Sequence, residues 1–146
     1  MTDEARLDDE RYRQYVWSIL AQACDEAPMG IWEPYWWANN VLRDLPVEDR
    51  LSWAERAMLE LLEEDFIGFY RKRWPGNGAQ QPLSKVEAMA VIRDDAWRQI
   101  PLQEADIWFG ATGTGDRRMG QAVQGGEWRG EASVEPGYRP PPADRS

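Results

Sequence analysis

The hydrophobic pattern changes in the middle of the segment AMLELLEEDFIGFY, residues 57–70. Up to Asp65, apolar side chains recur every three or four residues, as on the buried face of an amphipathic helix. From Phe66 onward the chain is aromatic and β-branched, which favours a strand that continues to Trp74. The run PGNG at residues 75–78 then predicts a turn. We therefore expect a helix that leads directly into a strand and a turn.

Three helices are expected before the strand, over residues 9–27, residues 32–42 and a third segment that ends at residue 64 or 65. The first carries apolar residues at helical spacing, namely Tyr12, Tyr15, Val16, Ile19, Leu20 and Ala23. The start of the third helix has two interpretations. Either Pro46 lies in its first turn, or Ser52 and Glu55 form a capping box that starts it later.

Two more elements are expected after the turn. Ser84 and Glu87 have the spacing of a capping box, which predicts a short helix over residues 84–94. The sequence DIWFGA at residues 106–111 predicts a second strand that pairs with the first. Residues 116–146 are rich in Gly, Arg, Glu and Pro and have too little apolar surface to offset the entropy of ordering them. We expect a disordered C-terminal tail there, and a flexible N-terminus over residues 1–8.

The helix-to-strand segment resembles the passage from recognition helix to wing in winged helix-turn-helix domains. There, a helix of alanine, a leucine pair and acidic residues runs into a strand, as at residues 57–70. The sequence IWFGATGTG at residues 107–115 is similar to the closing wing strand of such domains. Residues 9–115 thus resemble the winged-helix-like domain of small, uncharacterised actinobacterial proteins. The resemblance implies an α+β fold with three N-terminal helices and a two-stranded β-hairpin, here with a short helix inserted in the wing.

Composition narrows the classes of function. The chain has 146 residues, about one domain, and a formal net charge of −9, which argues against broad binding to nucleic acid or anionic membranes. Residues 1–65 hold 16 acidic and 6 basic side chains, so the acidity belongs to the expected helices. There is no histidine, the usual general base and metal ligand. We therefore expect no enzyme, no metal site and no small-molecule cofactor.

Two further observations concern the environment of the chain. Cys24 is the only cysteine, which rules out an intrachain disulfide, and without a histidine partner we expect it to be a buried structural thiol. The sequence MTDEARLDDER at residues 1–11 is acidic and polar, unlike a signal peptide. No uninterrupted apolar stretch approaches the length of a membrane span. We expect a cytoplasmic protein with no membrane partner.

The one basic cluster is Arg71, Lys72 and Arg73, followed by Trp74. On a wing, these side chains could contact phosphate, and the aromatic side chain could stack on a base. The alternative is an edge strand whose charges prevent aggregation or pair with the acidic helices. The third helix differs from a DNA-reading helix, because its carboxylates outnumber its arginines. A phosphate backbone would repel these carboxylates.

The segment over residues 32–37 contains Trp32, Tyr35, Trp36 and Trp37. Trp37 lies about 100° around the helix from Trp36, so the four side chains do not all fit one buried seam. Core packing is favoured for most of them, and Trp36 and Trp37 are the candidate exposed anchors for a partner. Glu60, Glu63 and Glu64 are spaced to share a cation, but a solvated acidic helix face is the favoured interpretation.

These observations lead to two hypotheses for function, both without catalysis. The first is a macromolecule-binding domain, of the DNA-binding or transcription-accessory kind, that acts through the basic wing. The alternative is an acidic protein-interaction factor of the immunity, antitoxin or DNA-mimic kind that binds a basic protein. DNA and protein partners both stay open at this point, and a homodimer is compatible with the sequence.

Overall fold

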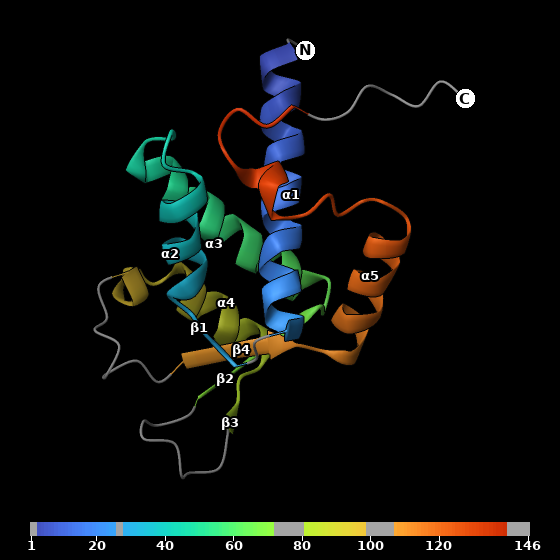
Figure 1. The fold of residues 1–146 in the computed structure, drawn as a ribbon. Coiled ribbons are helices and arrows are strands. Elements are labelled where there is room, and N and C mark those ends of the chain that lie inside the picture. Colours follow the sequence, from blue (N-terminus) through green and yellow to red (C-terminus); the bar gives the residue numbers. More distant parts are fainter. Residues whose placement is uncertain (1–2, 26–27, 72–80, 99–106, 140–146) are drawn as a thin grey trace.

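The computed structural model describes residues 3–25, 28–71, 81–98 and 107–139 (Figure 1). These residues form an α+β fold in which helices lie over one side of a four-stranded antiparallel sheet. Its elements in chain order are α1 (Asp3–Asp25), β1 (Met29–Gly30), α2 (Glu33–Val41), α3 (Val47–Glu63), β2 (Ile67–Arg71), β3 (Gln81–Pro82), α4 (Lys85–Arg93), the 3-10 helix η1 (Asp95–Arg98), β4 (Ile107–Ala111), α5 (Gly113–Gln124) and the 3-10 helix η3 (Glu131–Val134).

The sheet has the strand order β1-β4-β2-β3. Its longest pair joins β2 to β4, with Ile67 opposite Ala111 and Arg71 opposite Ile107. This confirms the predicted pairing between the strands at residues 66–74 and 106–111. The expected two-stranded hairpin is corrected to four strands, because β1 and β3 flank the pair on either side. Strands of two residues are too short to show an alternating pattern in the sequence.

Helices close one face of the sheet. Ile67, Phe69 and Phe109 are buried, whereas Tyr70 and Trp108 are only partly buried. Because side chains alternate between the two faces of a strand, the buried residues mark the face under the helices. Phe69 and Phe109 lie opposite each other in register, and their ring centroids are 5.0 Å apart. This aromatic pair forms the part of the core that lies on the sheet.

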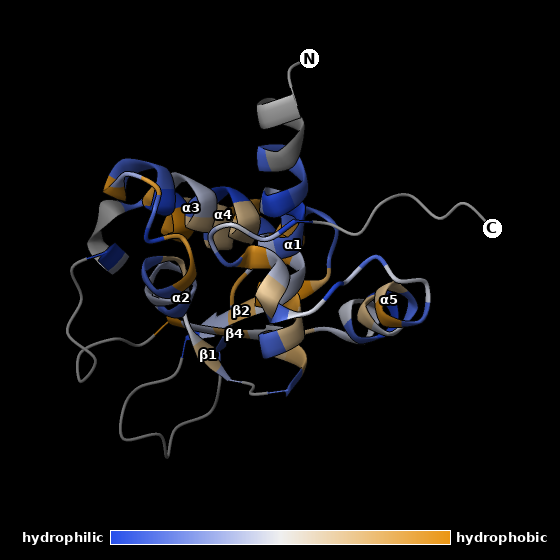
Figure 2. Ribbon diagram, turned by 45° about the horizontal axis from the view of Figure 1, so that its top comes forward, coloured by the Kyte–Doolittle hydropathy of each residue, from blue (hydrophilic) through white to orange (hydrophobic). Residues whose placement is uncertain are grey.

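Helix α1 runs through the centre of the core. Tyr15, Ile19 and Leu20 have no exposed surface, which confirms the apolar face predicted for the first helix. The helix contacts α3, α5, β4 and η3. Figure 2 shows hydrophobic residues gathered between the sheet and the helices above it, while much of the N-terminal half of α1 is hydrophilic. The helix begins at Asp3, so residues 3–8, predicted as a flexible N-terminus, extend it.

The helix starts decide between the interpretations of the sequence. Helix α3 begins at Val47 directly after Pro46, so the capping box proposed at Ser52 is wrong. Helix α4 does start with its predicted capping box. The Glu87 amide donates to Ser84 Oγ at 3.1 Å, and Glu87 Oε1 accepts from the Ser84 amide at 2.9 Å.

The predicted disordered tail over residues 116–146 is wrong for the part that the structure describes, up to residue 139. Helix α5 and the 3-10 helix η3 form there, and they bury Met119, Ala122 and Val134. The composition of this segment misleads because the apolar surface against which it packs lies elsewhere in the chain. These few side chains are sufficient, since α1 and β4 supply the other side of the interface. Residues 140–146 lie outside the described residues.

Polar side chains of α1 hold the C-terminal segment in place. Gln14 is 7% exposed, and its Nε2 donates to the Glu127 carbonyl at 2.7 Å. Its Oε1 accepts from the Arg129 amide at 2.9 Å and from Ser133 Oγ at 3.0 Å. One turn earlier, Arg11 Nε donates to the Val134 carbonyl at 2.8 Å. A polar residue buried with all these partners fixes the path of the chain after α5.

Candidate functional site

The outer face of α3 is acidic at both of its ends. Glu48 and Asp49 are exposed at its N-terminal end, and Glu63 and Glu64 at its C-terminal end. Asp65 is exposed directly after the helix and pairs with Lys85 Nζ at 3.0 Å. The favoured interpretation of a solvated acidic face therefore agrees with the exposure of Glu63 and Glu64, whereas Glu60 is only partly exposed and pairs with Arg13 and Arg56.

Both arginines of α3 are held by the protein itself. Arg50 donates to the carbonyls of Leu42, Arg43 and Leu45 at 3.1, 2.8 and 2.9 Å, which fixes the turn between α2 and α3. Arg56 lies over the Tyr12 ring with its guanidinium carbon 4.0 Å from the centroid, and its Nε is 3.4 Å from Glu60 Oε1. The two ends of the helix therefore expose carboxylates, while Glu55 and Glu60 in between pair with Arg98, Arg13 and Arg56.

A groove of about 550 Å³ lies where α1, the C-terminal end of α3 and α5 meet. Its apolar lining comes from Val16, Trp17, Leu61 and Phe66. Its polar lining comes from Glu60, Glu63, Glu64 and Glu127 together with Arg13 and Arg118. We call this site the acidic groove. Its volume lies within the range of roughly 300 to 1,000 Å³ that is typical of ligand sites in proteins.

The two arginines of the acidic groove each pair with a glutamate. Arg13 Nη1 lies 3.3 Å from Glu60 Oε2. Arg118 donates two hydrogen bonds to the Glu127 carboxylate, at 2.8 and 2.9 Å. The bond from Arg118 holds the pKa of Glu127 below its usual value. The Arg118 guanidinium also covers the Trp17 ring at 4.8 Å. Neither Glu63 nor Glu64 has a side-chain cation within ion-pair distance among the described residues.

The predicted basic cluster lies only partly within the described residues. Arg71 is exposed at the end of β2, opposite Gln81 of β3. The backbone and side chain of Ser84 lower the pKa of Glu87, and the charge of Arg71 adds to this effect. Arg71 therefore lies near an acidic side chain of α4. The other members of the predicted cluster, Lys72, Arg73 and Trp74, lie outside the described residues.

The tryptophan-rich segment divides between core and surface. Trp32 is buried and packs edge-on against Trp108, with ring centroids 5.2 Å apart. Trp36 is 50% exposed, as predicted for an anchor. Trp37 is partly buried, and its indole N–H donates to Ser18 Oγ at 2.9 Å. Of the two candidate anchors, Trp36 is the one with a large exposed surface.

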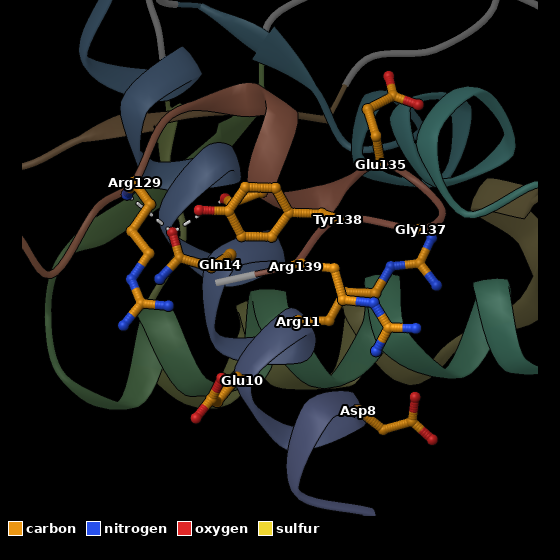
Figure 3. Close-up of a pocket in the computed structure, with 10 residues that line it drawn as sticks. Asp8, Glu10, Arg11, Gln14, Arg129, Glu135, Gly137, Tyr138 and Arg139 are labelled. Carbon is orange, nitrogen blue, oxygen red and sulfur yellow. Dashed lines mark hydrogen bonds between the residues drawn. The ribbon is translucent and has the colours of Figure 1, made fainter. Parts of the chain in front are cut away.

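A second, smaller pocket of about 200 Å³ lies between α1 and the C-terminal segment (Figure 3). Its lining brings together side chains of both charges, namely Asp8, Glu10, Glu135, Arg11, Arg129 and Arg139. Arg11 already binds Asp44 through two hydrogen bonds of 2.7 and 2.8 Å. Glu135 likewise pairs with Arg43 at 3.0 Å. Since neither sign dominates, this pocket has less selectivity for a charged partner than the acidic groove.

Cys24 is a partly buried thiol close to Asp116. Burial, with a hydrogen bond involving Asp116, raises the pKa of Cys24 to about 12, so this partly buried thiol stays protonated at neutral pH. Among the described residues, no three carboxylates or thiols gather in a way that could hold a metal ion. None of the described helices combines the length and apolarity needed to cross a bilayer.

Comparison with known proteins gives no further guide to the site. The chain matches no protein-family model, no curated protein and no solved structure.

Sequence reasoning found one wall of the acidic groove, since Glu60, Glu63 and Glu64 stand out in the third helix. It missed the other wall, Arg118 and Glu127, because both residues fall in the predicted tail. The available signal was the helical spacing of Met119 and Ala122.

Proposed function

We propose that this chain is a non-catalytic winged-helix domain that binds a basic protein partner through the acidic outer face of α3. The observation that carries the proposal is the state of the charged side chains on this helix. Glu48, Asp49 and Glu63 are exposed, whereas Arg50 is bound to three backbone carbonyls and the exposed Arg56 lies against Tyr12 and Glu60. An acidic face attracts a basic surface and increases the rate of its association.

The order of the elements supports the winged-helix part of the proposal. Helices α1, α2 and α3 precede the antiparallel pair β2 and β4, and β3 and α4 are inserted between the two strands. A short turn at residues 42–46 separates α2 from α3, as in a helix-turn-helix unit. In this arrangement α3 takes the position of the recognition helix. A helix in that position is the surface with which such domains meet their partners.

The charge of α3 argues for protein rather than DNA at this surface. A DNA-reading helix needs arginine or lysine free to reach phosphate or base edges. Arg50 is bound to three backbone carbonyls and Arg56 to Tyr12 and Glu60. The exposed glutamates would then face the phosphates directly, and such like charges repel. A lysine- or arginine-rich protein surface meets neither obstacle.

The proposal is tested by fluorescence anisotropy with two labelled probes at low salt, a random-sequence DNA duplex and a short oligo-lysine peptide. We expect the peptide to bind, and to bind less tightly as salt is added, because exposed charges are screened. We expect no binding of DNA. The double variant Glu63→Gln, Glu64→Gln should weaken peptide binding about fivefold, from two exposed ion pairs of ~0.5 kcal/mol each.

The matched control is Asp8→Asn with Asp9→Asn, because both residues are exposed on α1 and the change in net charge is the same. If both double variants weaken binding equally, the peptide senses only net charge and the proposed surface is wrong. If DNA binds, and if the triple variant Arg71→Ala, Lys72→Ala, Arg73→Ala abolishes that binding, the wing is the functional surface instead.

A further inference from the structure

We infer that the acidic groove binds a basic segment of the partner protein whose apolar side chain inserts between α1, α3 and α5. This inference rests on the proposed function and names the contact that would make it specific. Charge alone gives an acidic face little selectivity between basic partners. A groove with an apolar lining adds a requirement for shape and hydrophobicity.

The groove has the apolar lining that such a segment needs. Val16, Trp17 and Leu61 are each no more than 7% exposed, so they form a firm apolar base. Phe66, partly buried where α3 leads into β2, completes the apolar lining. A cleft lined by packed helices is a usual place for one face of an amphipathic peptide. The structure therefore provides a receptor for an apolar anchor.

The charges around this lining select the sign of the occupant. Four glutamates face two arginines, and each arginine pairs with one glutamate. Of these four glutamates, Glu63 and Glu64 are the two whose carboxylates make no such ion pair among the described residues, and the nearby Lys85 Nζ donates to the Glu63 backbone carbonyl and pairs with Asp65. Both glutamates are exposed at the end of α3. A lysine or arginine beside the partner's anchor would meet them, whereas a phosphate or an acidic peptide would be repelled.

The test uses two labelled peptides of equal charge. The first peptide carries leucines at every third or fourth position, with lysines between them. In the second peptide each leucine is replaced by serine. We expect the leucine peptide to bind about tenfold more tightly, as expected for the burial of one leucine side chain. The control variant Val86→Ala removes an exposed apolar side chain of α4 outside the groove and should leave both affinities unchanged.

NMR locates the contact without a variant that risks unfolding the core. The leucine peptide should shift the Trp17 indole signal and the methyl signals of Val16 and Leu61, and leave the Trp36 indole unmoved. Equal affinities for the two peptides, or shifts confined to Trp36, would overturn the groove as receptor while the acidic face of α3 retained its role. If neither these peptides nor oligo-lysine binds, the proposed function fails together with the inference.

Discussion

Helices α3 and α5 line the same groove, but different interactions hold them in place. Helix α3 buries five side chains along one face, namely Ala54, Ala57, Met58, Leu61 and Leu62. In α5, which contains three glycines, the buried residues are Gly115, Met119 and Ala122. Its first turn is capped by Thr112, whose Oγ1 accepts from the Gly115 amide at 3.0 Å and donates to the Asp65 carbonyl. Helix α5 therefore depends on residues far away in the sequence.

This difference predicts how each helix responds to substitution. Loss of packing in α3 should weaken the whole fold, because α3 contacts α1, α2 and α4. Loss of a contact in α5 should loosen mainly the C-terminal segment, because α5 contacts α1 and β4. Local and global unfolding can be separated by hydrogen exchange.

The largest effect is expected from Met58→Ala in α3. Met58 has no exposed surface, so truncation removes buried apolar contacts and leaves a cavity. We expect the free energy of unfolding to fall by about 3 kcal/mol. Urea denaturation measures this loss, and amide exchange should accelerate throughout α1, α3 and the sheet. Faster exchange confined to α3 would show that this helix is not part of the common core.

The next effect is expected from Gly115→Ala in α5. A Cβ at this position would collide with the backbone carbonyl of Phe66. Backbone cannot move aside as a flexible side chain can, so we expect a loss of about 2 kcal/mol. The matched control is Gly120→Ala in the same helix, where a Cβ meets nothing within 4 Å. That variant should gain up to about 1 kcal/mol through helix propensity.

Gln14→Ala should release the C-terminal segment from α1. The substitution removes the side-chain partner of the Glu127 carbonyl and of the Arg129 amide, while Ser133 Oγ keeps its hydrogen bond to the Gly130 carbonyl. We expect a loss of about 1.5 kcal/mol, since some of the freed groups regain hydrogen bonds to water. The Arg129 amide should exchange with solvent faster than in the unaltered chain. Unchanged exchange at Arg129 would mean that η3 and its contacts hold the segment without Gln14.

The smallest effect concerns pH. Hydrogen bonds from Arg11 hold the pKa of Asp44 below its usual value in the folded chain. The Asp44 carboxylate therefore stabilises the fold above its unfolded pKa, and this contribution is lost as pH falls through the lowered folded pKa. Because Asp44 is 41% exposed, we expect only about 0.5 kcal/mol. Asp44→Asn should abolish this pH dependence, and an unchanged acid profile in that variant would contradict it.

The sequence predicted those parts of the fold that local patterns determine. The α1 core face, the capping box at Ser84 and the pairing of the two long strands follow from residue spacing alone. The C-terminal segment did not follow, because its stability comes from Gln14 and from the close approach of Gly115 to Phe66. Such contacts join residues more than forty positions apart. A local sequence pattern does not predict such long-range contacts.

The same reason limited the prediction of the site. The acidic positions of α3 were visible, since glutamates at helical spacing indicate a charged face. That Arg50 and Arg56 would be bound within the protein was not visible, because their partners lie on the α2–α3 turn and on α1. The charge that α3 presents to a partner is therefore a property of the fold as well as of the composition.

The most direct test of the central claim is an NMR titration of the full chain with the leucine–lysine peptide and, separately, with duplex DNA. The peptide should shift signals of Trp17, Glu63 and Glu64, whereas DNA should shift none at low salt. Shifts caused by DNA and centred on Arg71, with the acidic groove silent toward the peptide, would contradict it.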